Sequence, residues 1–458
     1  MPQLFSFANL WVLPFWALMI GAPRARLTAR VVGSPLIVLP LIAAYAALVL
    51  PSLSGLLPIV ARPELGAVAT LLGTPAGATA GWTHFLAFDL WVGRFIVLDA
   101  RERSLPSIVL SPILLLTLLL GPLGLGAYLA LRAGALERVR GAWRLAFESS
   151  PALTWLGTAS LLAAVVGLGL QAVDPRQLAG ASVWLKPTKF GVSIAVFSFT
   201  LAWLLRAISV PQKQRRRLVT AIASLLLLEL VIICGQAARG VASHFNMATL
   251  LDALLFQVMG VAILAVTVAV ARLGIYALRT RYENSALGTG IRLGFAIMVF
   301  GCAIGAVMPR PTPTQLETLQ RGRPTPLIGS HTVGVEDDTH YEVPLTRWNT
   351  QSGDLRVSHF IGLHALQVLP LIGLWLSRRR RLDSQLATKF TWIAGAGYFG
   401  LTLTTLVQAL RGVPLFALDT PTLVLGAAVA LGCSAAAALA TYLSRLNGSI
   451  ALRSRRAA

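Results

Sequence analysis

Charged residues are scarce in this chain, and acidic residues are the scarcest of them. Only 12% of the 458 residues are charged, with 18 Asp and Glu against 39 Lys and Arg. Soluble domains carry about 25% charged residues, so a soluble globular fold is excluded. Instead, 56% of the residues are hydrophobic and the mean hydropathy is +0.72. Several apolar runs reach the roughly 18 residues that a transmembrane helix needs, which predicts a polytopic integral membrane protein.

Cysteines and nucleotide-binding motifs are equally rare. Cys234, Cys302 and Cys433 lie in apolar runs and form no C-x-x-C pair, so they predict small buried side chains rather than a disulfide framework. The sequence holds no G-x-x-x-x-G-K-[ST] phosphate loop, and direct energising by ATP is therefore not expected. No cofactor motif is evident.

The net charge of +21 comes from basic residues that are dispersed over short loops. Clusters such as 215–217 and 378–381 stand beside apolar runs, where the positive-inside rule expects them. Anionic lipid headgroups are a sufficient partner for such clusters. The charge therefore predicts a lipid bilayer as partner and no nucleic acid.

The predicted fold class is all-α, with about twelve transmembrane helices, four before residue 132 and eight after it. The first apolar run has no Lys or Arg before it, so it predicts a retained helix rather than a cleaved signal peptide. The predicted spans are 4–21, 35–54, 81–98, 108–131, 152–171, 190–208, 218–236, 249–271, 291–308, 357–377, 388–410 and 421–444.

A basic linker at 133–150 divides the chain into a four-helix membrane domain at 1–132 and an eight-helix membrane domain at 151–458. In the second domain, every basic loop cluster falls on one side of the membrane, which predicts a cytoplasmic C-terminus. The opposite side receives the long loop 309–356. The first four helices keep two possible orientations, because a count of their Lys and Arg residues nearly ties the two. Either the segment 64–74 is not a simple loop, or one orientation signal is overridden.

Three polar side chains, His84, Asp89 and Arg94, interrupt the apolar run GWTHFLAFDLWVGRFIVLDARER at 81–103. An ionised Asp at the centre of a membrane helix costs roughly 2.5–3.5 kcal/mol, so Asp89 marks an intramembrane site or an ion pair. Residues five apart are separated by about 140° on an ideal helix, and at most two of the three therefore face one pocket. Thr83 is expected to cap the start of this helix.

Four blocks of the first domain carry a family resemblance. They are FSFANLWVLPFWALMIGAPR at 5–24, SPLIVLPLIAAYAALVLPSL at 34–53, GTPAGATAGWTHFLAFDLWVGRFIVLDARER at 73–103 and SPILLLTLLLGPLGLGAYL at 111–129. Through them, residues 5–132 resemble the neoxanthin-synthase family, small four-helix membrane proteins named for abscisic acid deficiency. Plant members of that family take part in converting violaxanthin into neoxanthin. The resemblance implies a membrane-embedded isomerase or related enzyme that acts on a carotenoid or other isoprenoid lipid.

Such an isomerisation needs acid–base chemistry. Opening an allylic epoxide to an allene requires one proton delivered to the epoxide oxygen and one removed from carbon. Asp89 and His84 are the catalytic candidates, with Arg94 as counter-charge. Asp89 could instead pair with a backbone group or with a residue of another helix. The apolar polyene would lie among Trp82, Phe85, Phe88 and Trp91.

The second domain resembles no family of known chemistry, but its polar side chains gather toward the predicted non-cytoplasmic side. Polar residues that converge at one depth of a membrane protein indicate a cavity open to that side. The candidate substrate-binding residues are Lys186, Lys189, Glu229, Arg239, His244, His331, His359 and His364.

Several uses of this polar set compete. A metal site would combine His244, His331 and His359 with the carboxylates at 336–338, since imidazole and carboxylate suit zinc or iron, but no ligand spacing supports a metal. A b-type haem would need His364 and a second histidine. An anionic substrate would use the lysines and the arginine, with His364 for proton transfer. Helix capping and loop packing are the remaining use.

The loop 309–356 begins PRPTPTQLETLQRGRPTP, and its prolines predict an extended segment. Its later part alternates Val and Thr, with glycines, and predicts a short hairpin or a lid over the outer mouth of the domain. The predicted location is a bacterial-type inner (plasma) membrane. The alternatives to an isomerase are a transporter or binding protein for an apolar or anionic solute, or a redox membrane protein with haem or metal.

Overall fold

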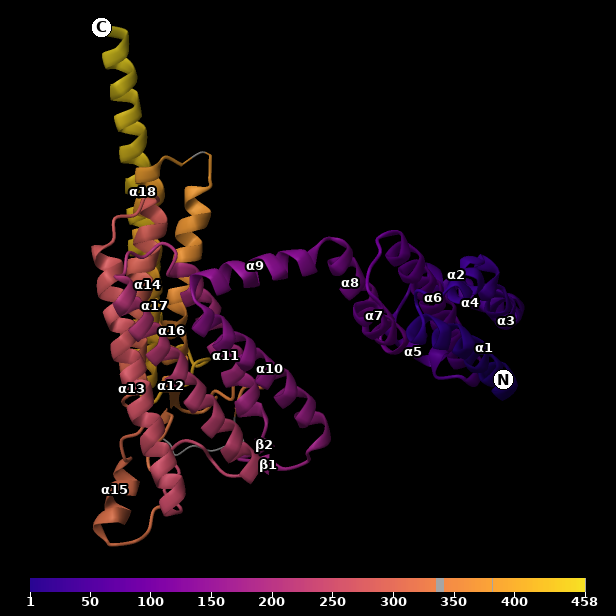
Figure 1. The fold of residues 1–458 in the computed structure, drawn as a ribbon, viewed down its shortest axis with the longest axis horizontal. Helices are drawn as coiled ribbons and strands as arrows, with labels where there is room; N and C mark the ends of the chain where they lie inside the picture. The colour runs from indigo at the N-terminus through magenta and orange to yellow at the C-terminus, as the bar shows by residue number, and fades with distance from the viewer. Residues whose placement is uncertain (335–341, 381, 458) are drawn as a thin grey trace. The chain divides into compact units, whose positions relative to one another are not determined.

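The computed structural model describes residues 1–334, 342–380 and 382–457, which fold as two units, Met1–Gly141 (unit 1) and Ala142–Ala458 (unit 2). Helices dominate both units (Figure 1), which confirms the all-α class. The division falls within the segment 133–150, where the chain forms helix α9 (Ala135–Ser149).

Unit 1 is built around α6 (Pro75–Glu102). This helix packs against other helices of the unit, among them α1 (Pro2–Gly21), α3 (Leu39–Val49), α7 (Ser107–Leu119) and α8 (Gly121–Arg132). The core between α1 and α6 contains Trp16, and Gly93 admits its ring, since a Cβ at Gly93 would stand 2.7 Å from it. The remaining elements are α2 (Arg26–Gly33), η1 (Pro35–Val38), η2 (Leu50–Ser52), α4 (Leu53–Ala61) and α5 (Leu65–Leu72).

Helix α6 begins earlier than the sequence predicted. The Thr74 hydroxyl accepts a 3.0 Å hydrogen bond from the Gly77 amide, and Pro75 occupies the first helical position, which suits a residue without an N–H. Thr83 therefore lies inside the helix and does not cap it. Its hydroxyl donates to the Thr79 carbonyl at 2.8 Å.

The predicted span 108–131 is wrong as one helix, because the chain breaks into α7 (Ser107–Leu119) and α8 (Gly121–Arg132). Pro122 is the physical cause, since a proline ring in a helix interior clashes with the carbonyl four residues earlier. Helix α8 then packs directly against α7, where Gly124 leaves no space for a Cβ beside Thr117.

Among the described residues, ten helices are long and apolar enough to cross a membrane, two in unit 1 and eight in unit 2. The predicted count was twelve. The two other predicted spans correspond to α6, which carries Asp89, Arg94, Asp99 and Arg101 within its length, and to the broken pair α7 and α8. The eight helices of unit 2 are α10 (Pro151–Val173), α11 (Leu185–Leu204), α12 (Gln212–Arg239), α13 (Leu250–Arg279), α14 (Ser285–Gly305), α16 (Leu355–Ser377), α17 (Ser384–Leu410) and α18 (Thr420–Ala457).

Short elements close one end of unit 2, where Figure 1 shows β1, β2 and α15. Strand β1 (Gln177–Leu178) pairs with β2 (Ala181–Ser182), and β3 (Thr332–Val333) pairs with β4 (Gly353–Asp354), both antiparallel. The loops rich in arginine, such as 206–217 and 378–380, lie at the other ends of these helices.

The predicted extended start of the loop 309–356 is wrong. Its prolines do not prevent a helix, because Pro313 occupies the first position of α15 (Pro313–Gln320), where no backbone donor is needed. Thr312 and Gln315 complete this start as a capping box, each side chain accepting from the other residue's amide. Within the described part of the predicted hairpin, β3 pairs with β4 and an isolated antiparallel bridge joins Glu342 to Asn349. The acidic residues 336–338 lie outside the described residues.

Helices α14 and α16 pack closely through facing glycines. A Cβ at Gly362 would stand 2.6 Å from the Gly301 Cα, and a Cβ at Gly301 would stand 2.7 Å from the Gly362 carbonyl carbon. Such backbone approach is typical of helix pairs in membranes, where packing rather than water drives association.

Gly362→Ala should therefore force α14 and α16 apart. Overpacking of this kind typically costs about 1–3 kcal/mol, so the thermal unfolding temperature of the detergent-solubilised protein should fall. Gly260→Ala in α13 is the matched control, because nothing stands within 4 Å of its added Cβ; that change should leave stability equal or slightly higher, since Ala is the better helix former. Equal unfolding temperatures for the two variants would contradict the close packing.

Candidate functional site

The polar residues of α6 contact three different neighbours. Asp89 is partly buried, and its carboxylate lies so close to Gly121, the first residue of α8, that no Cβ fits there. Asp89 thus faces the break between α7 and α8, where Pro122 ends one helix and starts the next.

Arg94 contacts α2, whereas Asp89 lies against α8. Its guanidinium donates to the Gly33 carbonyl at the end of α2, at 2.8 Å, and lies 4.8 Å from the centre of the Trp91 ring. Arg94 does not pair with Asp89, which agrees with their separation of about 140° around an ideal helix. The predicted counter-charge is therefore used to hold α2.

His84 lies on the exposed face of α6. Its ring stacks on Phe88 with centroids 4.5 Å apart and approaches Tyr45 of α3 at 5.7 Å. The four predicted polyene contacts are all exposed side chains on this helix: Trp82, Phe85, Phe88 and Trp91. The structure thus places one band of aromatic rings on α6, with His84 inside it and Asp89 at its edge.

Sequence reasoning missed a second charged group on α6, around Asp99. Its carboxylate accepts from the Tyr128 hydroxyl of α8 and pairs with Arg103 at 2.9 Å and Arg132 at 3.2 Å. This group joins the end of α6 to the end of α8. The alternating acidic and basic residues of DARER were the available signal, but Tyr128 stands too far along the chain to be paired with them from sequence.

In unit 2, three predicted residues come together at the end that carries β1 and β2. The Lys186 ammonium of α11 lies 2.9 Å from Nδ1 of His244, and Nε2 of that ring lies 3.4 Å from Oε1 of Glu229 on α12. Rings of Phe190, Phe245 and Phe256 surround the imidazole at centroid distances of 5.7, 6.4 and 6.3 Å. We call Lys186, His244 and Glu229 the polar triad.

The three other histidines of unit 2 that the structure describes make different contacts. His331 packs on Phe245 with centroids 4.9 Å apart, and His359 of α16 contacts the Gly301 carbonyl through Nδ1 at 2.7 Å. His364 contacts the Phe360 carbonyl of its own helix and stacks on that ring at 4.0 Å. No group of three or more His, Cys, Asp or Glu suited to a metal ion occurs in the part of the chain that the structure describes.

Two further predicted residues are bound by protein groups. Arg239 pairs with Asp252 at 2.6 Å, and that carboxylate also accepts from Gln236 and Thr249. Lys189 donates to the Thr346 carbonyl at 3.0 Å. Both contacts join neighbouring elements at the same end of unit 2 as the polar triad.

A second network near Lys189 was not predicted. Arg356 pairs with Asp354 at 2.6 Å and with Glu342 at 3.7 Å, and Arg347 pairs with Glu342 as well. The acidic residues singled out in the sequence were those at 336–338, which lie outside the described residues. Asp354 could have been found as a helix cap, since it directly precedes α16.

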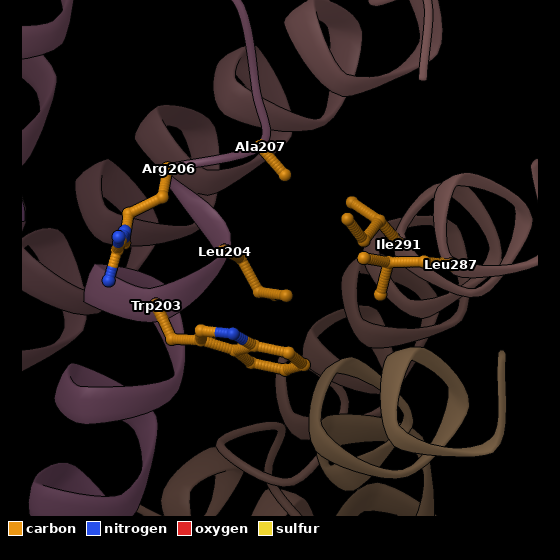
Figure 2. A pocket seen from close by; sticks show the side chains of 6 residues that line it. All are labelled: Trp203, Leu204, Arg206, Ala207, Leu287 and Ile291. Atoms are coloured by element: carbon orange, nitrogen blue, oxygen red, sulfur yellow. The ribbon is translucent and has the colours of Figure 1, made fainter. Parts of the chain in front are cut away.

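A separate pocket lies at the opposite end of α11 from Lys186. It has a volume of about 300 Å³ and is lined by Trp203, Leu204, Arg206, Ala207, Leu287 and Ile291. Figure 2 shows the Trp203 ring below the opening, with Leu204 facing Leu287 and Ile291 and with Arg206 directed away from them. This pocket is mainly apolar and offers one charged side chain at its rim.

Burial lowers the pKa of His244 well below its usual range, and the neighbouring Lys186 and His331 lower it further. Since 24% of the side-chain surface is exposed, the effect comes from the protein packed around its other faces. The folded protein therefore holds a neutral imidazole at neutral pH.

Acidification should destabilise the protein through His244. Because its folded-state pKa lies below the ordinary value of about 6.5, the unfolded chain takes up a proton that the folded chain does not as the pH falls past that value. The free energy of unfolding then decreases. In detergent, the unfolding temperature of His244→Gln should fall less between about pH 7 and pH 5 than that of the unchanged protein.

His364→Gln is the matched control, because that ring contacts only its own helix among the interactions described here for it. Its unfolding temperature should follow the pH dependence of the unchanged protein. Identical pH dependence in the His244→Gln variant would show that a different group is responsible.

Comparison with known proteins bears on unit 1. No curated protein and no solved structure matches the chain. Residues 3–128, however, match the family described as ABA DEFICIENT 4-like, and the match ends before unit 2 begins. This finding confirms the resemblance predicted from the blocks between residues 5 and 132. Unit 1 is thus similar to the neoxanthin-synthase-related membrane proteins.

Proposed function

We propose that unit 1 binds a carotenoid or related isoprenoid lipid along α6 and catalyses its isomerisation by proton transfer. The family match over residues 3–128 supports the substrate class. The ten apolar helices support a location in the membrane, where such a lipid resides.

The exposed aromatic band of α6 supports the binding of an extended apolar molecule. Its four rings lie on one helix between residues 82 and 91, a length of roughly 14 Å at 1.5 Å per residue. Aromatic side chains offer large apolar contact areas with little loss of conformational freedom. His84 lies within this band, and its imidazole ring would contact the polyene together with the four aromatic rings.

Asp89 carries the proposal, because it is the carboxylate placed beside that band. Among the described residues it forms no ion pair, unlike Asp99 on the same helix. Its carboxylate lies against Gly121 at the start of α8, beside the exposed rings, where it could exchange a proton with a bound lipid. Asp89 would therefore act as the base, rather than as one member of a row with His84 and Arg94.

The proposed reaction is an isomerisation, because substrate and product contain the same atoms. In an allylic epoxide, removal of a proton from carbon by Asp89 forms the new carbon–carbon double bond as the epoxide carbon–oxygen bond breaks. The oxygen receives a proton from water and becomes a hydroxyl group, and the protonated Asp89 returns its proton to the hydroxide that is left, so no oxidant or reductant is consumed. Arg94 would act only on position, by fixing α2 against α6 through Gly33.

Asp89→Asn should abolish the conversion, since general acid–base groups typically contribute about 10²–10⁴-fold. The measurement is chromatography of pigments extracted from epoxycarotenoid-producing cells that express each variant. Trp82→Ala should weaken conversion less, through loss of contact area alone.

Glu64→Gln is the matched control, because Glu64 is exposed at the start of α5 and away from the aromatic band. That variant should give the pigment profile of the unchanged protein. An unaltered pigment profile in cells that make the unchanged protein would refute the proposal, and so would full conversion by Asp89→Asn.

A further inference from the structure

Glu229 is the most deeply buried carboxylate that lacks a complete set of partners in the described part of unit 2. It lies within the apolar helix α12, and only 6% of its side chain is exposed. Its Oε2 is buried without a hydrogen-bond partner. A charged group inside a membrane protein is expensive and normally serves a relay, a pathway or a counter-ion.

Asp252 offers an internal comparison at the same end of unit 2. Its carboxylate is also buried, but it accepts from Thr249, Gln236 and Arg239 at 2.6–2.8 Å. Such a fully bonded carboxylate fixes two helices in place. Glu229 has one polar contact, 3.4 Å from His244. Pairing with protein groups explains why the Asp252 carboxylate can be buried, but it does not explain the burial of Glu229.

The triad has the geometry of a proton relay. The ammonium of Lys186 has only donors, so Nδ1 of His244 must accept. A neutral ring then carries its proton on Nε2, which is the nitrogen that faces Glu229 Oε1. The orientation of the ring is thus set for transfer from Nδ1 to Nε2 and on to the carboxylate.

We propose that unit 2 contains an intramembrane proton-binding site, in which Glu229 takes up and releases a proton through His244 and Lys186. One N–H bond of Lys186 breaks as a proton binds Nδ1, and the Nε2–H bond breaks as the carboxyl O–H forms. The proton is the only species transferred, so no further reactant is needed. A proton from solution then restores the ammonium.

Lys186 and His244 connect Glu229 to the surface. Both side chains are partly exposed, whereas only 6% of the Glu229 side chain is exposed. The loop that carries His244 lies between α12 and α13, at the end predicted to be non-cytoplasmic. Protons would therefore reach Glu229 from that side.

The charged groups around Glu229 determine how a substitution should change its protonation. Lys186 faces Glu229, Lys189 and Arg356, and His244 faces Lys186 and His331. Lys186 is the cation that acts directly on Glu229. Removing its charge should make the Glu229 carboxylate less stable and its protonated form more stable.

The test is infrared titration of the purified full chain in lipid vesicles. The carboxylic-acid band of a group shielded from water, which absorbs apart from the bands of the exposed carboxyl groups, should grow as the pH falls and should shift in D2O. Glu229→Gln should lose this band. Lys186→Met should move its titration midpoint to higher pH.

Glu317→Gln is the matched control, because Glu317 is exposed and pairs only with Arg321 on the surface helix α15. It should keep the titrating band. Persistence of the band in Glu229→Gln would overturn the proposal. If Glu229→Gln does not fold, the Lys186→Met variant provides the test instead. An unchanged titration midpoint of the band in Lys186→Met would also overturn the proposal. These readouts are independent of pigment conversion by unit 1.

Discussion

The cost of leaving a polar group unpaired in an apolar surrounding governs this structure. Most buried polar side chains in the described helices bond a neighbour or their own backbone, as Thr83 bonds the Thr79 carbonyl and Thr154 bonds the Ser150 carbonyl. Such contacts decide which helix faces can meet, because an unsatisfied group in hydrocarbon costs several kcal/mol. The few groups that escape this rule are therefore the informative ones, and Glu229 is the clearest of them.

The same constraint explains where the sequence was a good guide. Long apolar runs predicted helices such as α12 and α13, because nothing else satisfies the backbone inside a membrane. The sequence was a poor guide at 108–131, where one continuous apolar run forms two helices, α7 and α8. Hydropathy does not predict the break at Pro122, because this proline changes the backbone geometry and not the solvation of the segment. Pro313 shows the reverse case, since a proline at a helix start is harmless.

The candidate sites divide in the same way. Residue types and depth were enough to single out Lys186, Glu229 and His244, and the structure places these three side chains in one chain of contacts. Their partners could not be predicted, because the contacts join α11, α12 and a loop that are distant in sequence. Arg239 looked equivalent to Lys186 in the sequence, yet Asp252 neutralises it. Only the fold distinguishes a paired cation from one that faces a proton acceptor.

The two units use buried carboxylates differently, and this difference separates their proposed chemistry. Asp89 is partly buried, lies against the start of α8 and stands beside an exposed aromatic surface. Glu229 lies inside α12 and contacts an imidazole, which an ammonium contacts in turn. A partly buried carboxylate beside a surface that binds the substrate suits direct proton exchange with that substrate. A carboxylate whose charge depends on one movable proton suits a site that changes its charge in each cycle.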